Sequence, residues 1–108
     1  MGEPVDTSIL DKQIARLEEQ AKSKASSGNL NSELAQAYVD RATKLTEARQ
    51  YRAALGDWRR ALRYDPSNQQ AQTMVGTITA ILQQLGRPVP EPGTEPTPIR
   101  KEKVEGGK

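Results

Sequence analysis

The residues from Tyr51 to Pro66 constrain the fold more than any other part of the chain. Small and apolar side chains recur there at helical spacing, which places them on one face of a helix: Tyr51, Ala54, Leu55, Trp58, Ala61 and Leu62. Trp58 would act as a large apolar wedge against neighbouring elements, while the alanines permit a close approach. Pro66 then ends the helix, because its ring clashes with the preceding turn. The segment predicts a closely packed helix over about residues 50–64.

Three other segments carry the helical period, and no segment alternates as a β-strand would. The other predicted helices cover about residues 7–27, 31–48 and 68–85. Gly28 is expected to end the first of these helices, and Gly86 is expected to end the last. Ser67 and Gln70 are spaced for a capping box before the last helix. Because the links are only about two or three residues long, consecutive helices must pack antiparallel. The predicted fold is all-α, an antiparallel array of about four helices.

The two ends of the chain differ from this helical part. The N-terminus holds Gly2 and Pro4 without any period, and five of the seven prolines fall between residues 88 and 98. We therefore expect three regions: a disordered N-terminus over 1–5, a helical domain over 6–86 and a disordered Pro-rich tail over 87–108. A domain of about 80 residues buries little more than half of its surface on folding, so its margin of stability is small.

Composition argues against catalysis. The 108 residues include no cysteine and no histidine, which removes most nucleophile–base pairs and nearly all transition-metal sites. Carboxylate pairs such as Glu18 with Glu19, or Asp57 with Asp65, are expected on solvent-exposed faces. Apart from Gly106 and Gly107 near the C-terminus, the glycines are scattered singly, so no phosphate-binding loop is predicted. We predict that the protein is not an enzyme and needs no cofactor, and we assign no catalytic, cofactor-binding or metal-binding residue.

Charge and hydropathy predict a soluble chain. The net charge of +2 comes from 16 basic and 14 acidic residues that are interspersed, less than the excess typical of a dedicated nucleic-acid-binding domain. No apolar run is long enough for a transmembrane helix, so we expect no membrane insertion. The N-terminus lacks the features of a signal peptide. We favour the cytoplasm, with the periplasm or secretion as alternatives if a signal peptide was removed.

The stretch from Ala35 to Asn68 resembles a tetratricopeptide repeat (TPR), a unit of about 34 residues with two antiparallel helices. The resemblance rests on a signature that spans both helices: Tyr38, Ala42, Leu45, Tyr51, Ala54, Trp58, Ala61 and Pro66. Arg41 departs from the family, which usually has a large aliphatic residue there. Either Arg41 extends along the inner face or the N-terminal helix packs differently at this point. A partial unit begins at Gln69, which implies one complete repeat, a capping helix after it and an N-terminal cap before it.

The resemblance implies a non-catalytic protein–protein interaction module, a scaffold or adaptor that binds a peptide or helix of a partner protein. In this family the first helix of each hairpin forms the ligand groove. Here the residues of the predicted partner groove would be Gln36, Val39, Asp40, Thr43, Glu47, Gln70, Thr73 and Thr77. An alternative stays open, in which the N-terminal helix of the protein itself covers this face.

Two other functions remain as alternatives. One and a half repeats are fewer than the roughly three that a stable stack needs. The chain could therefore be a small structural subunit that self-associates, as a homo-oligomer, or that a larger complex stabilises. A group of arginines in and beside the third predicted helix suggests nucleic-acid binding, which the net charge does not favour: Arg49, Arg52, Arg59, Arg60 and Arg63. We expect these arginines to form a solvated outer face paired with Glu47, Asp57 and Asp65.

Overall fold

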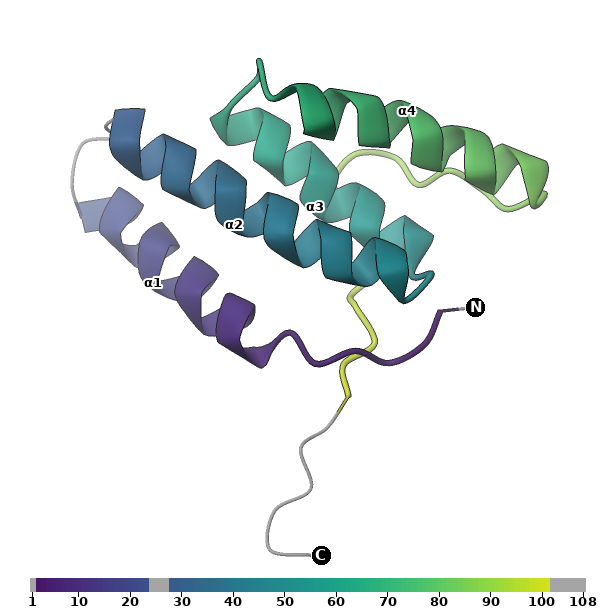
Figure 1. Cartoon of the computed structure of the whole chain (residues 1–108), viewed down its shortest axis with the longest axis horizontal. Helices are drawn as coiled ribbons and strands as arrows, with labels where there is room; N and C mark the ends of the chain where they lie inside the picture. The colour runs from purple at the N-terminus through teal and green to yellow at the C-terminus, as the bar shows by residue number, and fades with distance from the viewer. Residues whose placement is uncertain (1, 24–27, 102–108) are drawn as a thin grey trace, which may run out of the picture.

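The computed structural model describes residues 2–23 and 28–101, which form four helices. Their bounds are Ser8–Ser23 for α1, Gly28–Glu47 for α2, Tyr51–Tyr64 for α3 and Gln69–Gln84 for α4. The helices lie side by side in chain order, and successive helices run in opposite directions (Figure 1). The described residues contain no β-strand, so the predicted all-α class is confirmed. None of the described helices is long and apolar enough to span a membrane.

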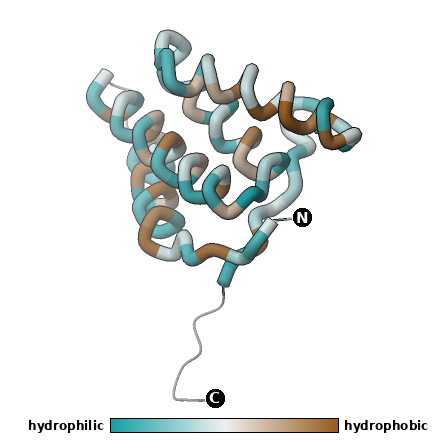
Figure 2. The backbone as a smooth tube through the Cα atoms, turned by 45° about the vertical axis from the view of Figure 1, so that its right-hand side comes forward, coloured by the Kyte–Doolittle hydropathy of each residue, from teal (hydrophilic) through white to brown (hydrophobic). Residues whose placement is uncertain are grey.

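The core is centred on α2 and α3, which make the most extensive helix contact. Hydrophobic residues are interspersed with hydrophilic ones along each helix (Figure 2), as expected when one face of each helix is buried. Ala42 of α2 and Ala54 of α3 are fully buried, and Trp58 is almost so. The indole Nε1 of Trp58 donates a hydrogen bond to Thr46 Oγ1 at 3.1 Å, which satisfies the buried N–H. Small and large residues therefore occupy the buried positions that the periodicity predicts.

The start of α2 differs from the prediction. The sequence predicts that Gly28 ends the first helix, because glycine tolerates the left-handed conformation that closes many helices. In the structure Gly28 is the first residue of α2, and α1 ends at Ser23. Residues 24–27, which the prediction includes in the first helix, lie outside the described residues. Glycine is also tolerated at the start of a helix, so its presence alone does not distinguish the two boundaries.

The start of α4 also differs, because the predicted capping box of Ser67 and Gln70 is wrong. The Ser67 hydroxyl instead donates to Asp65 Oδ1 at 2.9 Å. Asn68 caps the helix, and its Oδ1 accepts a hydrogen bond from the Ala71 amide at 2.9 Å. Asparagine is at least as good an N-cap as serine, and the Asp65 carboxylate already engages Ser67. The helix therefore begins one residue later than predicted.

Gly86, which the sequence predicts to end the last helix, closes α4 two residues after its last helical residue, Gln84. The Gly86 amide donates to the Gln83 carbonyl at 3.1 Å, and the Arg87 amide donates to the Leu82 carbonyl at 2.9 Å. These two hydrogen bonds define a Schellman motif, which requires a left-handed residue after the helix. Gly86 provides it with a φ of 68° and no side chain to strain.

Helix α2 ends with the same motif but without glycine. The Arg49 amide donates to the Thr46 carbonyl at 3.0 Å, and the Gln50 amide donates to the Leu45 carbonyl at 2.9 Å. Arg49 therefore takes the left-handed position, with a φ of 63°. The Cβ of an L-residue approaches the following carbonyl in this conformation, which costs about 1–2 kcal/mol. The turn between α2 and α3 therefore adopts a conformation that arginine disfavours.

Replacing Arg49 with glycine should stabilise the fold. We expect Arg49→Gly to raise the free energy of unfolding by roughly 0.5–1 kcal/mol, because relief of the left-handed strain exceeds the entropy that glycine adds to the unfolded chain. Urea denaturation followed by circular dichroism measures this change. Gly86→Ala is the matched control, since it introduces the same strain at the end of α4 and should destabilise. A lower stability of Arg49→Gly would contradict the interpretation.

The sequence predicts a disordered tail over residues 87–108, and the structure gives residues 87–101 a defined path against the helices. This segment leaves α4, passes behind α3 and meets the N-terminal segment (Figure 1). Arg59 of α3 holds its middle part, donating to Glu95 Oε2 at 2.6 Å and to the Pro90 carbonyl at 2.9 Å. Pro90 is buried, and Val89 packs against the core. Residues 102–108, the remainder of the predicted tail, lie outside the described residues.

Residues 2–5 of the N-terminus, which the sequence predicts to be disordered, also contact the helical domain in the structure. Gln50, at the start of α3, binds both ends of the described chain. Its Nε2 donates to the carbonyls of Glu3 at 2.6 Å and Ile99 at 2.8 Å, and its Oε1 accepts from the Ile99 amide at 2.7 Å. Val5 adds a backbone hydrogen bond from its amide to the Ile99 carbonyl at 3.3 Å. The buried side-chain amide of Gln50 thus satisfies backbone groups outside the helices. The composition of the N-terminus and the tail does not reveal this contact.

Gly56 explains how the tail can lie so close to α3. Glycine inside a helix costs about 1 kcal/mol relative to alanine, so its presence needs a reason. A Cβ atom on Gly56 would lie 3.0 Å from the Cβ of Glu95 and 3.1 Å from Nη1 of Arg60. The absence of a side chain therefore leaves the space that Glu95 occupies. The loss of helix propensity is offset by the packing of the tail.

Docking of the tail should depend on pH through Glu95. Burial acts to raise the pKa of Glu95, but hydrogen bonds from Arg59 and from backbone amides hold that pKa below its ordinary value. Docking is then fully stabilised above the ordinary pKa of a glutamate and weakens as the pH falls through the lowered pKa. We expect the hydrogen-exchange protection factor of the Ile99 amide to decrease in acid more than those of core amides.

The matched variant Glu95→Gln should lower this protection factor at neutral pH and reduce its dependence on pH. Part of the dependence should remain, because Asp11 pairs with Arg100 of the tail at 2.7 Å. Burial acts to raise the pKa of Asp11, while hydrogen bonds from Arg100, Arg41 and Thr7 lower it overall, so it titrates in the same direction. A protection factor that is the same at acidic and neutral pH would show that the carboxylates do not hold the tail.

Candidate functional site

The residues of the predicted partner groove separate into exposed and buried groups. Gln36, Asp40 and Glu47 of α2 are exposed, and so are Gln70, Thr73 and Thr77 of α4. Val39 is buried in the core with 3% of its surface exposed. Thr43 is half-buried, and its hydroxyl donates to the Val39 carbonyl at 2.8 Å. Val39 therefore contributes to stability, and the accessible part of the predicted surface consists of the six exposed residues.

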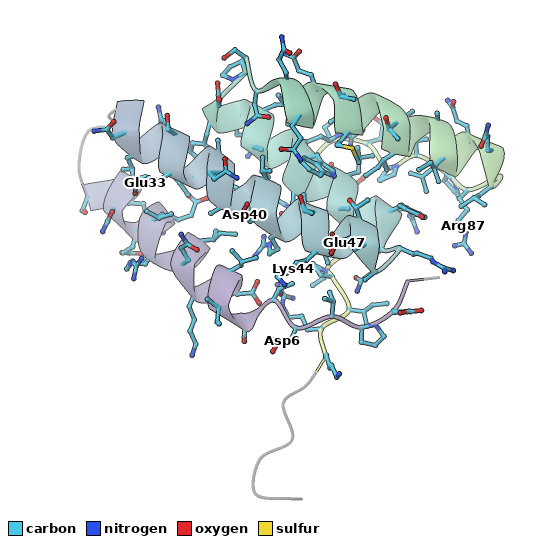
Figure 3. The ribbon with its side chains drawn as sticks, viewed as in Figure 1. Asp6, Glu33, Asp40, Lys44, Glu47 and Arg87 are labelled. Carbon is cyan, nitrogen blue, oxygen red and sulfur yellow. The ribbon has the colours of Figure 1, made fainter. Side chains whose placement is uncertain are left out.

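The exposed side of α2 carries a row of carboxylates, Glu33, Asp40 and Glu47, which we call the acidic line. The three residues are seven positions apart, so they follow one side of the helix over about 21 Å. Figure 3 shows them along α2, with Lys44 near them. Lys44 borders a small pocket beside Asp6 at the start of α1. None of the salt bridges among the described residues involves the acidic line.

Helix α1 does not cover this surface. It packs against α2 through buried residues such as Ile14 and Leu17. Gln36 and Asp40 stay exposed, and the Gln36 side-chain amide donates to Asp40 Oδ1 at 2.9 Å. The alternative in which the N-terminal helix hides the predicted groove is therefore excluded for these α2 residues. A partner would find their carboxylate and amide groups accessible to solvent.

The exposed side of α4 is polar but uncharged. The helix contains no acidic or basic residue, and its surface is made of glutamine, threonine, glycine and alanine. Gly76 has open space around it, so no described atom covers that part of the helix. The accessible residues of the predicted groove therefore combine a negative side on α2 with a neutral side on α4.

Arg41, which departs from the repeat signature, is the centre of a largely buried ionic network. Its guanidinium binds Asp57 with a fork of two hydrogen bonds, Nε to Oδ2 at 2.7 Å and Nη2 to Oδ1 at 3.0 Å. The remaining Nη1 donates to Asp11 of α1 at 2.9 Å. Arg60 also donates to Asp57, at 2.7 Å. The expectation that Asp57 lies on an exposed face is wrong, since it is completely buried. Burial acts to lower the pKa of Arg41, but the two aspartates raise it overall.

Glu18 is also less exposed than predicted. The hydroxyl groups of Tyr38 and Tyr64 both donate to its carboxylate, at 2.5 and 2.9 Å, and the two rings stack with centroids 6.0 Å apart. Burial and the Glu18 carboxylate raise the pKa of both tyrosines. The Arg41 guanidinium lies 5.5 Å from the Tyr38 ring centroid. These groups satisfy one another and fix α1 against α2 and α3, so they offer no open site.

The predicted arginine face does not form a continuous surface. Arg59 is engaged by Glu95 and Arg60 by Asp57, while Arg63 is exposed. Arg49 lies just before α3 and Arg52 lies in its first turn, where both line a pocket beside the tail. Of the partners expected for these arginines, Asp57 is confirmed. Glu47 and Asp65 form no ion pair with these arginines among the described residues, and Asp65 instead accepts a hydrogen bond from Ser67.

Comparisons with protein-family models, with curated proteins and with solved structures gave no significant match. The TPR resemblance therefore rests on the signature residues, and any function has to be argued from the surface of this chain. Two features of that surface escaped the sequence prediction. Glu33 could have been found from its seven-residue spacing to Asp40, whereas the pocket at Arg52 depends on how the tail folds back.

Removing Arg41 alone should destabilise the protein more than replacing the whole pair. Arg41→Ala leaves the Asp57 carboxylate buried with one partner fewer, which should lower the free energy of unfolding by roughly 3–5 kcal/mol. The double variant Arg41→Met with Asp57→Leu removes both charges and keeps the volume, so most of the stability should return. Urea denaturation of both variants tests this order. Equal stabilities would show that packing, and not charge compensation, decides at this position.

Proposed function

We propose that the protein is a non-catalytic interaction module that binds a basic peptide or helix of a partner protein along α2. The acidic line is the observation that carries this proposal. Its carboxylates are exposed and are not neutralised by salt bridges among the described residues. They can therefore attract and orient a positively charged partner, since complementary charges set the register and speed the encounter.

The dimensions of the acidic line suit a short segment. About 21 Å of helix surface matches a partner helix of roughly 14 residues, at a rise of about 1.5 Å per residue. Such a helix would present lysine or arginine at the same seven-residue spacing. An extended peptide of about six or seven residues spans the same distance. The uncharged exposed residues of α4, Gln70, Thr73 and Thr77, would supply additional hydrogen bonds to a longer ligand.

The TPR resemblance agrees with this location. In that family the first helix of each hairpin contributes the ligand surface, and α2 contains the corresponding signature residues Tyr38, Ala42 and Leu45. Binding through a helix surface of this kind requires a rigid support more than catalytic groups. The fully buried pair of Ala42 and Ala54 provides that support by packing α2 closely on α3.

The acidic line favours a basic partner over the two alternatives. A symmetric dimer through this face would place carboxylates against carboxylates, because a twofold interface is formed by the same patch on both subunits. A nucleic acid would bring phosphates to the same carboxylates, whereas nucleic-acid binders neutralise phosphates with lysine and arginine. Neither ligand is complementary to this surface.

Charge reversal on the acidic line should abolish binding without unfolding the protein. The probe is a synthetic helix of about 15 residues with lysines at seven-residue spacing, and its affinity is measured by fluorescence anisotropy at several salt concentrations. Asp40→Lys with Glu47→Lys should weaken binding at least about tenfold and remove its salt dependence. Both residues are exposed, so the free energy of unfolding should change by only about 0.5 kcal/mol.

The matched control reverses two exposed carboxylates elsewhere, Glu19 of α1 and Glu91 of the tail. Glu19→Lys with Glu91→Lys changes the net charge by the same amount and should retain most of the affinity. An equal loss in both double variants would mean that net charge alone drives binding. Undiminished binding by the Asp40 and Glu47 variant would contradict the proposal. Sedimentation of the unmodified protein would reveal self-association, which would instead favour the structural-subunit alternative.

A further inference from the structure

A separate pocket lies where the start of α3, the end of α4 and the tail come together. Its volume is about 520 Å³, within the range of pockets that bind small molecules. Three arginines line it, Arg49, Arg52 and Arg87, and none of its described lining residues is acidic. The pocket shares no residue with the acidic line on α2, so its ligand is independent of the proposed protein partner.

The walls of the pocket are partly apolar. Tyr51, Leu85 and Ile99 contribute to its lining. Leu85 is 57% exposed and Ile99 is 52% exposed, so both keep accessible hydrocarbon at this pocket. Both lie beside arginines at the same opening. A ligand with an anionic group and an apolar body would cover the exposed hydrocarbon and meet the positive charge together.

The backbone at the start of α3 adds hydrogen-bond donors to the same pocket. The first hydrogen bond of the helix runs from the Ala54 amide to the Gln50 carbonyl, which leaves the amides of the first turn without an acceptor in the helix. Gln50 occupies the N-cap position, but its side chain makes no capping hydrogen bond because it holds Glu3 and Ile99 instead. The residues of this uncapped turn, from Tyr51 to Ala53, line the pocket.

Arg52 brings a guanidinium with an unsatisfied nitrogen to the same pocket. Its Nε atom is buried and has no hydrogen-bond partner among the described residues. A buried guanidinium nitrogen without an acceptor is unfavourable, and a bound water or anion is one explanation for such a group. Arg52 as a whole is only partly buried and lines the pocket, so a rotation of its side chain would bring the guanidinium, Nε included, against an oxyanion there. Carboxylates and phosphates match the planar guanidinium, which can donate two parallel hydrogen bonds to them.

We propose that this pocket binds a small organic oxyanion, a carboxylate or phosphate ester with an apolar body. The oxyanion accepts hydrogen bonds from Arg52 and from the uncapped amides of α3, where the helix dipole adds further attraction. Arg49 contributes a second positive charge from the strained end of α2. The apolar body lies against Leu85 and Ile99. The tail forms one wall, so binding also favours its docked position.

The proposal can be tested with three probes: phenyl phosphate, phenylacetate and inorganic phosphate. Chemical shifts of the Tyr51, Arg52 and Ala53 amides are followed by nuclear magnetic resonance as each probe is titrated to about 10 mM, a range that detects the weak affinity expected of fragments. We expect phenyl phosphate or phenylacetate to shift these amides and to bind more tightly than inorganic phosphate. Binding by one aromatic probe alone identifies its head group as the preferred oxyanion.

Two variants on α3 separate a specific site from general attraction by positive charge. Arg52→Gln should weaken the preferred probe about tenfold or more, because a charge-assisted hydrogen bond is lost. Arg63→Gln removes the same charge from an exposed position of the same helix outside the pocket and should leave the affinity unchanged. A third variant, Arg49→Gly, should bind several-fold more weakly although its unfolding midpoint rises.

The results that would overturn the proposal are equally specific. No shift of the three amides with any probe would exclude an oxyanion site at the start of α3. Equal losses of affinity in Arg52→Gln and Arg63→Gln would reduce the effect to net charge. Inorganic phosphate that binds as tightly as the aromatic probes would exclude a role for the apolar walls. The lysine helix used as a probe for α2 should not compete, so this outcome does not depend on the proposed protein partner.

Discussion

The buried carboxylate of Asp57 is the constraint on which the arrangement of the other elements depends. A carboxylate removed from water is costly unless opposite charges and hydrogen bonds surround it. Arg41 supplies both from α2, and its third hydrogen bond reaches Asp11 on α1. Asp11 in turn accepts from Arg100 in the tail. Compensation of one charge therefore sets the relative positions of α1, α2, α3 and the tail, while the alanines and Trp58 fill the space between the helices.

The helices were predictable because their signals are local. The period of apolar residues and the position of Pro66 place α3 within one residue of its observed bounds. The tail was not predictable in this way, because its partners are distant in the sequence and involve single side chains such as Gln50 and Arg59. A high proline content indicates that a segment does not form a helix or strand by itself. It does not indicate whether another part of the protein binds the segment. Gly56 was a local indication of that surface, because glycine lowers the stability of a helix interior without an evident reason in the sequence.

The candidate sites show the same division between local and distant information. Exposure of Asp40 and Glu47 follows from the helical period, and the seven-residue spacing extends the surface to Glu33. Burial of Val39 depends on how α2 packs in the core, which the period of α2 alone does not determine. The pocket at Arg52 needs α3, α4 and the tail in place together. A single sequence identifies which helix side is exposed, whereas it does not identify cavities formed between distant segments.

The hydrogen bonds of Gln50 have a consequence for how the protein unfolds. A linear array of helical hairpins is stabilised mainly by contacts between neighbours, so its terminal elements can open separately from the rest. Here the same side chain binds Glu3 near one end of the described chain and Ile99 near the other. Opening either end therefore disturbs the junction of α2 and α3 at the centre of the core. The two ends are therefore coupled, because release of either one removes a hydrogen bond from the side chain that also holds the other.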